Sequence, residues 1–427
     1  MSDPPPGSGA HRLGPVQGCA LYVGAVLGTG VIALPALAVK AAGPASLIAW
    51  IGLVVLSIPL AATFAALGAR YPDSGGVSTY ARRAFGETPA VLVGWSFYFA
   101  VPVGAPAAAL FGGQYVADAV GGGRVTTVIT AAGLIVGVGS ANALGLQVSA
   151  RLQLALAGVL CVLMIVSVVV SLPHARTANL HPFAPHGWGA IGSAGALLVW
   201  SFAGWEAITH LAGEFRRPER DLARATGAAL VVVGVLYLGV AFATVAVLGP
   251  SAAGSRAPLG DLLAFGVSGG HGVAAVMAVL LTAGTMNAYF AGASKLGAAL
   301  GRDGALPAWL AHGSVVGEVP RRSLAVLTVG SAIALAVVEI ADLDVHPLVL
   351  LTSAAFATVY AVGAAAAVRL LPAGGPARPV AVLACVAIAL LMAAVGAYLI
   401  WPAVLAVAAA TFVHQRGVRL RNAVRLH

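Results

Sequence analysis

The sequence predicts an all-α membrane protein with twelve transmembrane helices, and three observations lead to this fold class. The 427-residue chain is 60% hydrophobic and only 9% charged, whereas soluble proteins carry about 25% charged residues. The apolar residues are grouped in blocks of about 18–25 residues, the length that spans a bilayer as a helix. The alternating segments of about ten residues that are typical of outer-membrane barrels do not occur. Lipid is therefore the predicted environment of most of the chain.

The apolar blocks give the predicted helices in order. The first block begins near Val16, is too long for the core of a signal peptide and is not followed by a cleavage site, so it is expected to remain in the mature protein. The last two blocks are short and are separated only near Tyr398–Pro402, so eleven helices is the competing count. The predicted blocks are 16–38, 45–68, 88–117, 125–143, 152–172, 190–212, 226–248, 271–298, 323–340, 346–370, 379–397 and 399–414.

Basic residues decide between the two counts. With twelve helices and a cytoplasmic N-terminus, all but four of the 23 basic residues lie on the cytoplasmic side, as the positive-inside rule requires. Eleven helices would place the cluster Arg416–Arg425 outside. Topology thus explains the net charge of +9, and no nucleic-acid partner is expected. The four basic residues predicted outside are Lys40, Arg124, Arg176 and Arg256.

The first block contains a predicted helix break at Gly28-Thr29-Gly30. These residues lie near its centre, and Pro35 removes a backbone donor a turn later. Because lipid offers no hydrogen-bond partners, such a break is expected to line a cavity. The alternative is close helix packing through small residues, since Gly24 and Gly28 stand four apart; packing can account for Gly24 while Gly28–Gly30 line a site.

The sixth block contains the second predicted break, around Gly204. Three aromatic residues surround this glycine, and the ionisable Glu206 follows it. An acid at membrane depth is costly and indicates a function, although a structural Glu206 satisfied by neighbouring hydroxyl or backbone groups is the alternative. The aromatic residues are Trp200, Phe202 and Trp205, and packing against lipid or core is the alternative for each.

Blocks one and six stand in corresponding positions if the first ten helices form two halves of five. Paired interruptions of this kind predict a binding site near the middle of the membrane, between inverted repeats. Half-helix N-termini favour an anionic group and freed carbonyls a cationic one, and a zwitterionic amino acid presents both. The predicted organisation is a short cytoplasmic tail at 1–12, a transport core at 13–370 with repeats at about 13–172 and 190–370, helices 11–12 at 377–414, and a basic cytoplasmic tail at 415–427.

Four stretches resemble the amino acid–polyamine–organocation permeases. Together they run from about residue 13 to 325, in the order and at the membrane sides that the family shows. The most specific is the loop Tyr71-Pro72-x2-Gly75-Gly76-x3-Tyr80-x-Arg82-x2-Phe85-Gly86. The others are Gly24-x3-Gly28-Thr29-Gly30-Val31-Ile32, Phe202-Ala203-Gly204-Trp205-Glu206 with Glu214-x3-Pro218-x-Arg220, and Gly301-Arg302-Asp303-Gly304-Ala305-Leu306-Pro307.

The resemblance implies a leucine-transporter-type fold with broken helices 1 and 6, two extra C-terminal helices, and a role for individual residues. The N–H groups around Thr29 and Gly30 would hold the substrate carboxylate, and carbonyls near Trp200 and Ala203 its ammonium. Trp200 and Phe202 are candidates for an aromatic gate, and Glu206 for a proton-responsive or gating carboxylate. The predicted substrate-binding residues are Gly28, Thr29, Gly30, Ile32, Trp200, Phe202, Ala203 and Gly204; Glu206 and His210 are predicted to act in gating or proton coupling.

The chain also departs from the family. Proton-coupled members often have a basic residue inside helix five in place of a sodium ion, but block 152–172 has only Arg151 at its edge, so that coupling mode is not assigned. Lys295 replaces the usual arginine in helix eight and is expected to snorkel. Glu206, His210 and Glu214 stand four apart and predict a proton path along one helix face; the alternative is that the last two are ordinary residues of the cytoplasmic end.

The predicted function is secondary transport of neutral, hydrophobic amino acids such as branched-chain residues or methionine, because Glu206 is the only acid deep in a predicted helix. The chain's shortness resembles the small bacterial hydrophobic amino-acid exporters of the family. Uptake, export and exchange stay open, H⁺ or Na⁺ is the candidate coupling ion, and no cofactor is expected. We expect a monomer or homodimer in the inner (plasma) membrane with both termini cytoplasmic. The alternatives are a cationic amino acid or polyamine exchanger, a passive channel and a substrate receptor.

An enzyme is not expected. The loop with His174, His181 and His186 lacks carboxylates and has the Pro/Gly setting of an ordinary external loop. Three cysteines inside apolar blocks favour neither disulfides nor a metal site. No phosphate-binding Gly-x4-Gly-Lys-Ser/Thr sequence occurs, so the predicted transport is secondary. The three cysteines are Cys19, Cys161 and Cys385.

Overall fold

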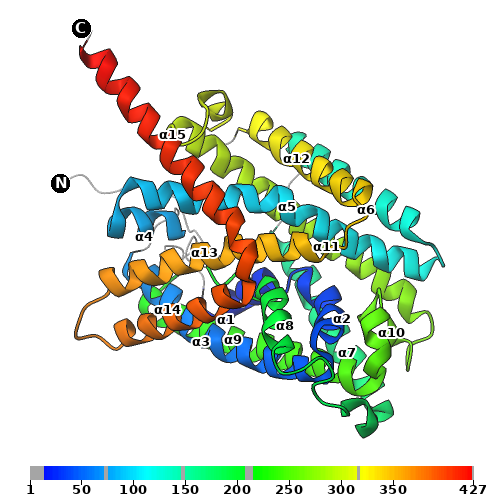
Figure 1. The fold of residues 1–427 in the computed structure, drawn as a ribbon. Coiled ribbons are helices and arrows are strands. Elements are labelled where there is room, and N and C mark those ends of the chain that lie inside the picture. The colour runs from blue at the N-terminus through cyan, green and yellow to red at the C-terminus, as the bar shows by residue number, and fades with distance from the viewer. Residues whose placement is uncertain (1–13, 72–75, 146–149, 207–214, 315–317, 426–427) are drawn as a thin grey trace, which may run out of the picture.

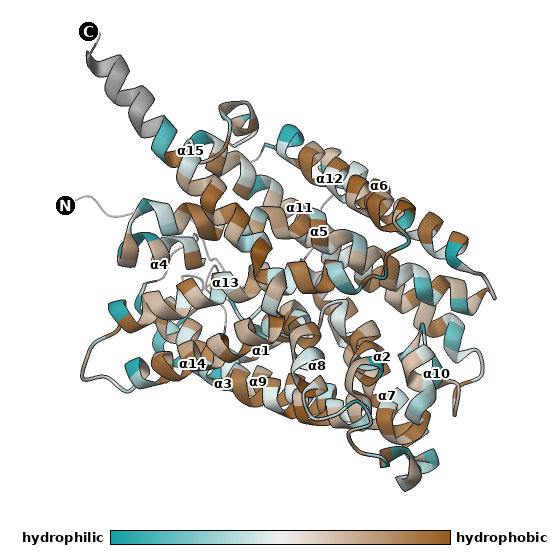
Figure 2. Ribbon diagram, in the orientation of Figure 1, coloured by the Kyte–Doolittle hydropathy of each residue, from teal (hydrophilic) through white to brown (hydrophobic). Residues whose placement is uncertain are grey.

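The structure, a computed structural model, describes residues 14–71, 76–145, 150–206, 215–314 and 318–425 (Figure 1). This part of the chain contains helices and turns but no strand. Within it, nine helical runs are long and apolar enough to cross a membrane. Hydrophobic residues cover the outward faces of helices such as α6 and α12 (Figure 2). The chain is therefore a multi-pass α-helical membrane protein.

The principal helices follow the apolar blocks. Two of the nine runs join two helices each: 30–70 contains α2 and α3, and 377–415 contains α14 and most of α15. The α-helices are α1 (Pro15–Val26), α2 (Gly30–Ala42), α3 (Ser46–Arg70), α4 (Gly76–Phe85), α5 (Glu87–Ala119), α6 (Arg124–Ala143), α7 (Ala150–Ser171), α8 (Ala190–Leu198), α9 (Pro218–Ala243), α10 (Pro258–Leu263), α11 (Gly270–Arg302), α12 (Arg321–Ile340), α13 (His346–Leu370), α14 (Ala377–Val395) and α15 (Ile400–Arg425).

Part of the loop motif at 71–86 forms a helix of its own, α4 (Gly76–Phe85), where the sequence predicted a loop. Its apolar side chains Val77 and Tyr80 are buried, whereas Arg82 and Arg83 are exposed. Such an amphipathic helix of ten residues is too short to span a bilayer. It packs against α5 and α13 at one end of the bundle.

The long helix α5 forms the centre of the bundle. It packs against α11, α6 and α13, and its apolar residues are buried over most of its length. At 33 residues it is about 50 Å long at 1.5 Å per residue. It therefore connects the two ends of the molecule, which lie near α4 and α10 in Figure 1.

We call the end near α4 the basic end. Three hydrogen bonds tie helix termini together there: Trp95 Nε1 donates to the Ala305 carbonyl (2.8 Å), Tyr71 Oη to the Leu370 carbonyl (3.1 Å), and Arg321 Nε to the Ala143 carbonyl (3.3 Å). The same helix termini carry a set of arginines. These are Arg70, Arg82, Arg83, Arg302, Arg321, Arg322 and Arg369.

We call the opposite end, near α10, the paired end, because basic residues there are paired with acids. Lys40 Nζ lies 3.0 Å from Asp344 Oδ2. Arg124 contacts Glu339 at 2.8 Å and also Asp342. The predicted segregation of basic residues thus has a structural counterpart, with most arginines at one end and few cations at the other, of which Lys40 and Arg124 are paired with acids.

Candidate functional site

The first apolar block is interrupted where its sequence predicts a break. Helix α1 ends at Val26 and α2 begins at Gly30. The Gly28 N–H donates to the Val26 carbonyl (2.8 Å) in a tight turn rather than continuing the helix. The first N–H groups of a helix have no intrahelical acceptor, and no side chain caps α2 at Thr29. An uncapped helix N-terminus is therefore present inside the bundle.

The sixth block is interrupted as well. The nine-residue helix α8 continues as a short 3-10 helix, η4 (Val199–Phe202), and then as a turn over 203–206. Gly204 has φ +121°, a conformation that only glycine adopts without strain. The predicted second break is therefore observed at Gly204.

The two interruptions are packed against each other. A Cβ on Gly204 would lie 2.8 Å from the Ala25 carbonyl oxygen, and a Cβ on Gly30 would lie 2.6 Å from Ser201 Oγ. Tyr237 of α9 has its hydroxyl 2.9 Å from the Val26 carbonyl and 2.8 Å from the Ser201 carbonyl. This buried hydroxyl donates to one freed carbonyl at a time, one on each broken helix.

A central cavity lies at this junction. Its walls come from α1, α2 and the turn between them, η4, α5, α11 and α13. Trp200 closes one side, with its ring 6.3 Å from that of Phe111. The lining residues are Ala25, Val26, Gly28, Thr29, Gly30, Ala100, Val101, Gly104, Ala105, Ala108, Trp200, Ala203, Thr285, Met286, Tyr289, Thr352 and Phe356.

Helix ends supply the electrostatics of this cavity, since none of its described lining residues is charged. The N-terminus of α2 at Gly30 carries a partial positive charge. The C-termini of α1 at Val26 and of η4 near Ala203 carry partial negative charge. A ligand with one anionic and one cationic group, and an otherwise apolar body, matches this arrangement.

Glu206 lies just outside the central cavity and is only 4% exposed. Tyr360 Oη donates to Glu206 Oε2 (2.5 Å). The Gly204 nitrogen lies 3.0 Å from Glu206 Oε2 and 3.0 Å from Tyr360 Oη. Hydrogen bonds of this kind are what a buried carboxylate requires. They link the break of the sixth block to α13.

Each predicted site residue can now be placed. Gly28, Thr29, Gly30, Trp200 and Ala203 line the central cavity. Ile32 does not: it is 2% exposed, and its carbonyl accepts a hydrogen bond from Tyr115 Oη (2.6 Å). Gly204 and Glu206 line a neighbouring cavity. Phe202 is described by its backbone alone, as the last residue of η4.

Glu206, His210 and Glu214 were predicted to share one helix face, but the structure describes Glu206 as part of a turn. Glu206 lies in the turn 203–206, because the break at Gly204 ends the helical geometry that i, i+4 spacing requires. His210 and Glu214 lie outside the described residues. Trp205 is fully buried with its ring 5.6 Å from that of Tyr22, so the packing alternative holds for this aromatic residue.

Several residues of the site were missed by the sequence analysis. Tyr237 and Tyr360 reach the broken helices, and Tyr289 lines the central cavity. A usable signal existed, since a tyrosine within an apolar span needs a partner for its hydroxyl. Which backbone groups it would meet depends on helices far apart in the sequence.

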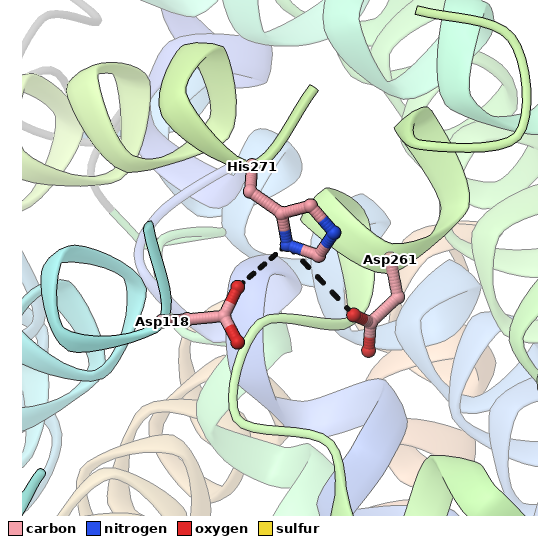
Figure 3. Close-up of side chains that lie close together, drawn as sticks. All are labelled: Asp118, Asp261 and His271. Atoms are coloured by element: carbon pink, nitrogen blue, oxygen red, sulfur yellow. Dashed lines mark hydrogen bonds and ion pairs between the residues drawn. The ribbon is translucent and has the colours of Figure 1, made fainter. Parts of the chain in front are cut away.

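A second polar cluster lies at the paired end and joins α5, α10 and α11 (Figure 3). His271 Nδ1 lies 2.6 Å from Asp118 Oδ2 and 3.9 Å from Asp261 Oδ1. These three side chains offer ligand atoms within 4.8 Å of one another, but 2.6 Å is a hydrogen-bond distance. Burial raises the pKa of Asp261, and the charge of Asp118 adds to that effect. A hydrogen bond between His271 and Asp118 thus joins α11 to α5, and the carboxylate of Asp261 in α10 lies beside this pair.

Comparison with known proteins gives consistent matches. The profile of the family described as "Amino acid permease" matches residues 13–417. The amino acid permease YecA of Bacillus subtilis is 34% identical over 403 residues, which cover 94% of this chain and 95% of that protein. The L-methionine/branched-chain amino acid exporter YjeH of Escherichia coli is 36% identical over 297 residues, covering 67% and 69%. The branched-chain amino acid permease BcaP of Bacillus subtilis is 25% identical over 318 residues, covering 70% and 68%.

Proposed function

The chain belongs to the amino acid permease family, and from that premise we propose that it is a secondary carrier of neutral amino acids with apolar side chains. The observation that carries this proposal is the central cavity. The N-terminus of α2 would bind the carboxylate, the carbonyl ends of α1 and η4 would bind the ammonium, and an uncharged wall would receive the side chain. A cationic amino acid or polyamine would need a further acid, and none occurs among the described lining residues.

The substrate class proposed is methionine and the branched-chain amino acids. Alanine, valine, methionine and aromatic side chains form most of the wall, which suits unbranched and branched aliphatic groups. The relative YjeH is named as an exporter of L-methionine and branched-chain amino acids, and BcaP as a permease of branched-chain amino acids. The exporter among these relatives supports export as the direction.

The proposed architecture is twelve transmembrane helices, with the first ten forming two inverted repeats of five and α14 and α15 following them. In this arrangement the breaks at Gly28–Gly30 and at Gly204 occupy corresponding positions of the two repeats. The basic end would lie on the cytoplasmic side of the inner membrane, because arginines gather there. Both termini would then be cytoplasmic.

Alternating access would use the buried network around Glu206. Glu206 Oε2 receives the Tyr360 hydroxyl and the Gly204 N–H, so it ties the moving break of the sixth block to α13. Movement of this break relative to α13 would lengthen these contacts, and protonation of Glu206 would weaken them. Glu206 is thus the proposed gating carboxylate, with H⁺ as the favoured coupling ion.

Proteoliposome counterflow with labelled leucine tests the carrier assignment, together with thermal-shift screening of the twenty amino acids on purified protein. We expect leucine, isoleucine, valine and methionine to raise the Tm and to drive counterflow. Gly30→Leu should abolish both, because a Cβ there would lie 2.6 Å from Ser201 Oγ. The control is Gly137→Leu, since a Cβ on that exposed glycine of α6 meets no atom within 4 Å.

Other outcomes would replace the proposal. Stabilisation by arginine, lysine or polyamines alone would indicate a cationic exchanger. Flux without trans-stimulation would indicate a channel, and binding without flux a receptor. If no amino acid raises the Tm or crosses the membrane, the amino-acid assignment is wrong.

A further inference from the structure

A second, larger cavity leads from the central cavity toward the basic end. The two cavities share Ala25, Val101, Thr285 and Tyr289. We call the second one the vestibule. Its other lining residues come from α1, α4, α5, α11 and the turn after η4. Helices α1, α5 and α11 therefore line both cavities, whereas α4 lines only the vestibule.

One face of α11 runs along the whole vestibule. Its lining positions recur every three or four residues, as expected for a single helix face: Thr285, Ala288, Tyr289, Gly292, Ala293, Lys295, Leu296, Ala299 and Arg302. From Thr285 to Arg302 this face is about 25 Å long at 1.5 Å per residue. A Cβ on Gly292 would meet no atom within 4 Å, so the space in front of this face is open.

Lys295 supplies a positive charge partway along that face. Its side chain is exposed although it lines an internal cavity, so it faces the vestibule. A snorkelling side chain, as predicted from the sequence, is compatible with this position. Lys295 lies about 15 Å along α11 from Thr285 of the central cavity, ten residues away.

The other charges of the vestibule are already engaged. Glu206 accepts hydrogen bonds from Tyr360 and Gly204. Arg302 Nε lies 3.2 Å from Asp303 Oδ1 at the end of α11. Lys295 forms no ion pair with any residue that the structure describes. It is therefore the cation of this cavity that is available to an anionic group entering from the basic end.

We propose that Lys295 and the open face of α11 around Gly292 form a staging site that binds the carboxylate of an amino acid in the vestibule, before it reaches the central cavity. This proposal deepens the proposed function and rests on it. The ammonium group of lysine is a compact charge on a flexible stem, so it can follow a carboxylate along the vestibule. Val101, Phe97 and Leu296 form an apolar wall of the vestibule. They contact the substrate side chain while Lys295 binds its carboxylate.

The staging site acts on entry from one side only. A water-exposed ammonium attracts a carboxylate modestly, and salt screens the attraction. It raises the local concentration of substrate at the vestibule without altering the helix ends of the central cavity. The KM measured from the basic end should therefore depend on Lys295, whereas the maximal rate and the KM from the other end should not.

Transport of labelled leucine into everted and right-side-out membrane vesicles tests this. For Lys295→Met we expect the KM from the basic end to rise by about threefold to tenfold, with the maximal rate and the KM from the paired end unchanged. Lys295→Arg should restore the KM. Lys40→Met is the matched control, because Lys40 is the chain's other lysine and lies at the paired end, bonded to Asp344.

Wild-type protein provides a readout that does not depend on the folding of a variant. Raising salt from about 0.05 M to about 0.5 M shortens the screening length and should raise the KM from the basic end alone. Phosphatidylcholine proteoliposomes separate this effect from binding of anionic lipid, because the salt dependence must persist in them.

The outcomes separate the two proposals. If wild type transports leucine but Lys295→Met leaves the KM from the basic end unchanged, the staging site is wrong and the carrier assignment stands. An equal rise of the KM from both ends also overturns the staging site, since it places the effect in the central cavity. If wild type transports no amino acid, both proposals fail.

Discussion

The two ends of the central cavity are built differently. Toward the paired end, α10 is wedged between α2, α7 and α11, and Tyr115 binds both the Ile32 carbonyl (2.6 Å) and the Leu259 N–H (3.2 Å). Toward the basic end, the vestibule separates α11 from the helices opposite, and its α11 residues Ala288 and Gly292 are exposed. One end is closed by packing, and the other is an open cavity.

The difference implies that the two ends of the central cavity present unequal barriers to opening. Closure at the paired end is distributed over α10, Tyr115 and the cluster of Asp118, Asp261 and His271. At the basic end the vestibule is open while Glu206 keeps its hydrogen bonds with Tyr360 and Gly204, so these bonds do not close that end. Because distributed contacts are lost together only at high cost, we infer that the paired end is the harder one to open. Three substitutions and one pH dependence test this comparison.

The largest effect is expected at Gly204, where the interruptions of the first and sixth blocks are packed against each other. Gly204→Ala forces a side chain into a φ of +121° with its Cβ 2.8 Å from the Ala25 carbonyl oxygen. Strain of about 1–3 kcal/mol is typical of such positions, so we expect a lower Tm and transport reduced at least about tenfold. The control is Gly192→Ala in α8, since a Cβ there meets no atom within 4 Å. Normal transport by Gly204→Ala would show that the two breaks move independently.

The next effect concerns the open end alone. Gly292→Leu fills the vestibule with a branched side chain, and a Cβ at this position has no atom within 4 Å to resist it. We expect the maximal rate of leucine transport to fall by about tenfold while the Tm stays within about 2 °C, because no packing is lost. Gly137→Leu in α6 is the matched control. A rate equal to that of wild type would mean that substrate does not pass along α11.

Much of this asymmetry could not be predicted from the sequence. The helix breaks were predictable, because Gly28-Thr29-Gly30 and Gly204 are local signals of broken helix. Glu206 was correctly singled out as a buried acid, and the structure places it in the turn 203–206, which its spacing from His210 did not indicate. Its partner Tyr360 is 154 residues away, and Tyr115 meets Leu259 across 144 residues. Such pairings are set by how helices pack, which periodicity along one helix does not encode.

The third test loosens the closed end. Tyr115→Phe leaves the buried Leu259 N–H without its acceptor and removes the donor to Ile32, at a cost of about 1–3 kcal/mol. Amide exchange in α10 should therefore accelerate by about fivefold to a hundredfold, while exchange in α4 is unchanged.

Tyr98→Phe is the control for that substitution. It removes a tyrosine hydroxyl from the same helix, α5, but at the basic end. There Tyr98 Oη donates to the Ser323 carbonyl (3.2 Å). Faster exchange should then appear in α12 rather than in α10. If both variants accelerate α10 alike, the paired end is not held by local contacts.

The smallest effect is a pH dependence of the closed end. Burial raises the pKa of Asp261 above its ordinary value, so packing of α10 favours the protonated carboxyl. A group whose pKa is raised by packing stabilises the packed state at low pH and loses that contribution as pH rises through the raised pKa. Amide exchange in α10, corrected for its intrinsic pH dependence, should therefore accelerate by about threefold or less between about pH 4 and about pH 7.

Two variants assign that pH dependence to its source. Asp118 and His271 face Asp261, and Ser255 donates a hydrogen bond to it. Asp261→Asn keeps the side chain neutral at every pH, so exchange in α10 should become flat over this range. His271→Gln removes the imidazole but retains the buried carboxyl, so the slope should persist. A normal slope in Asp261→Asn would show that burial of this carboxyl does not set the pH dependence of α10. The closed end would then be held by the packing of α10 against α2, α7 and α11.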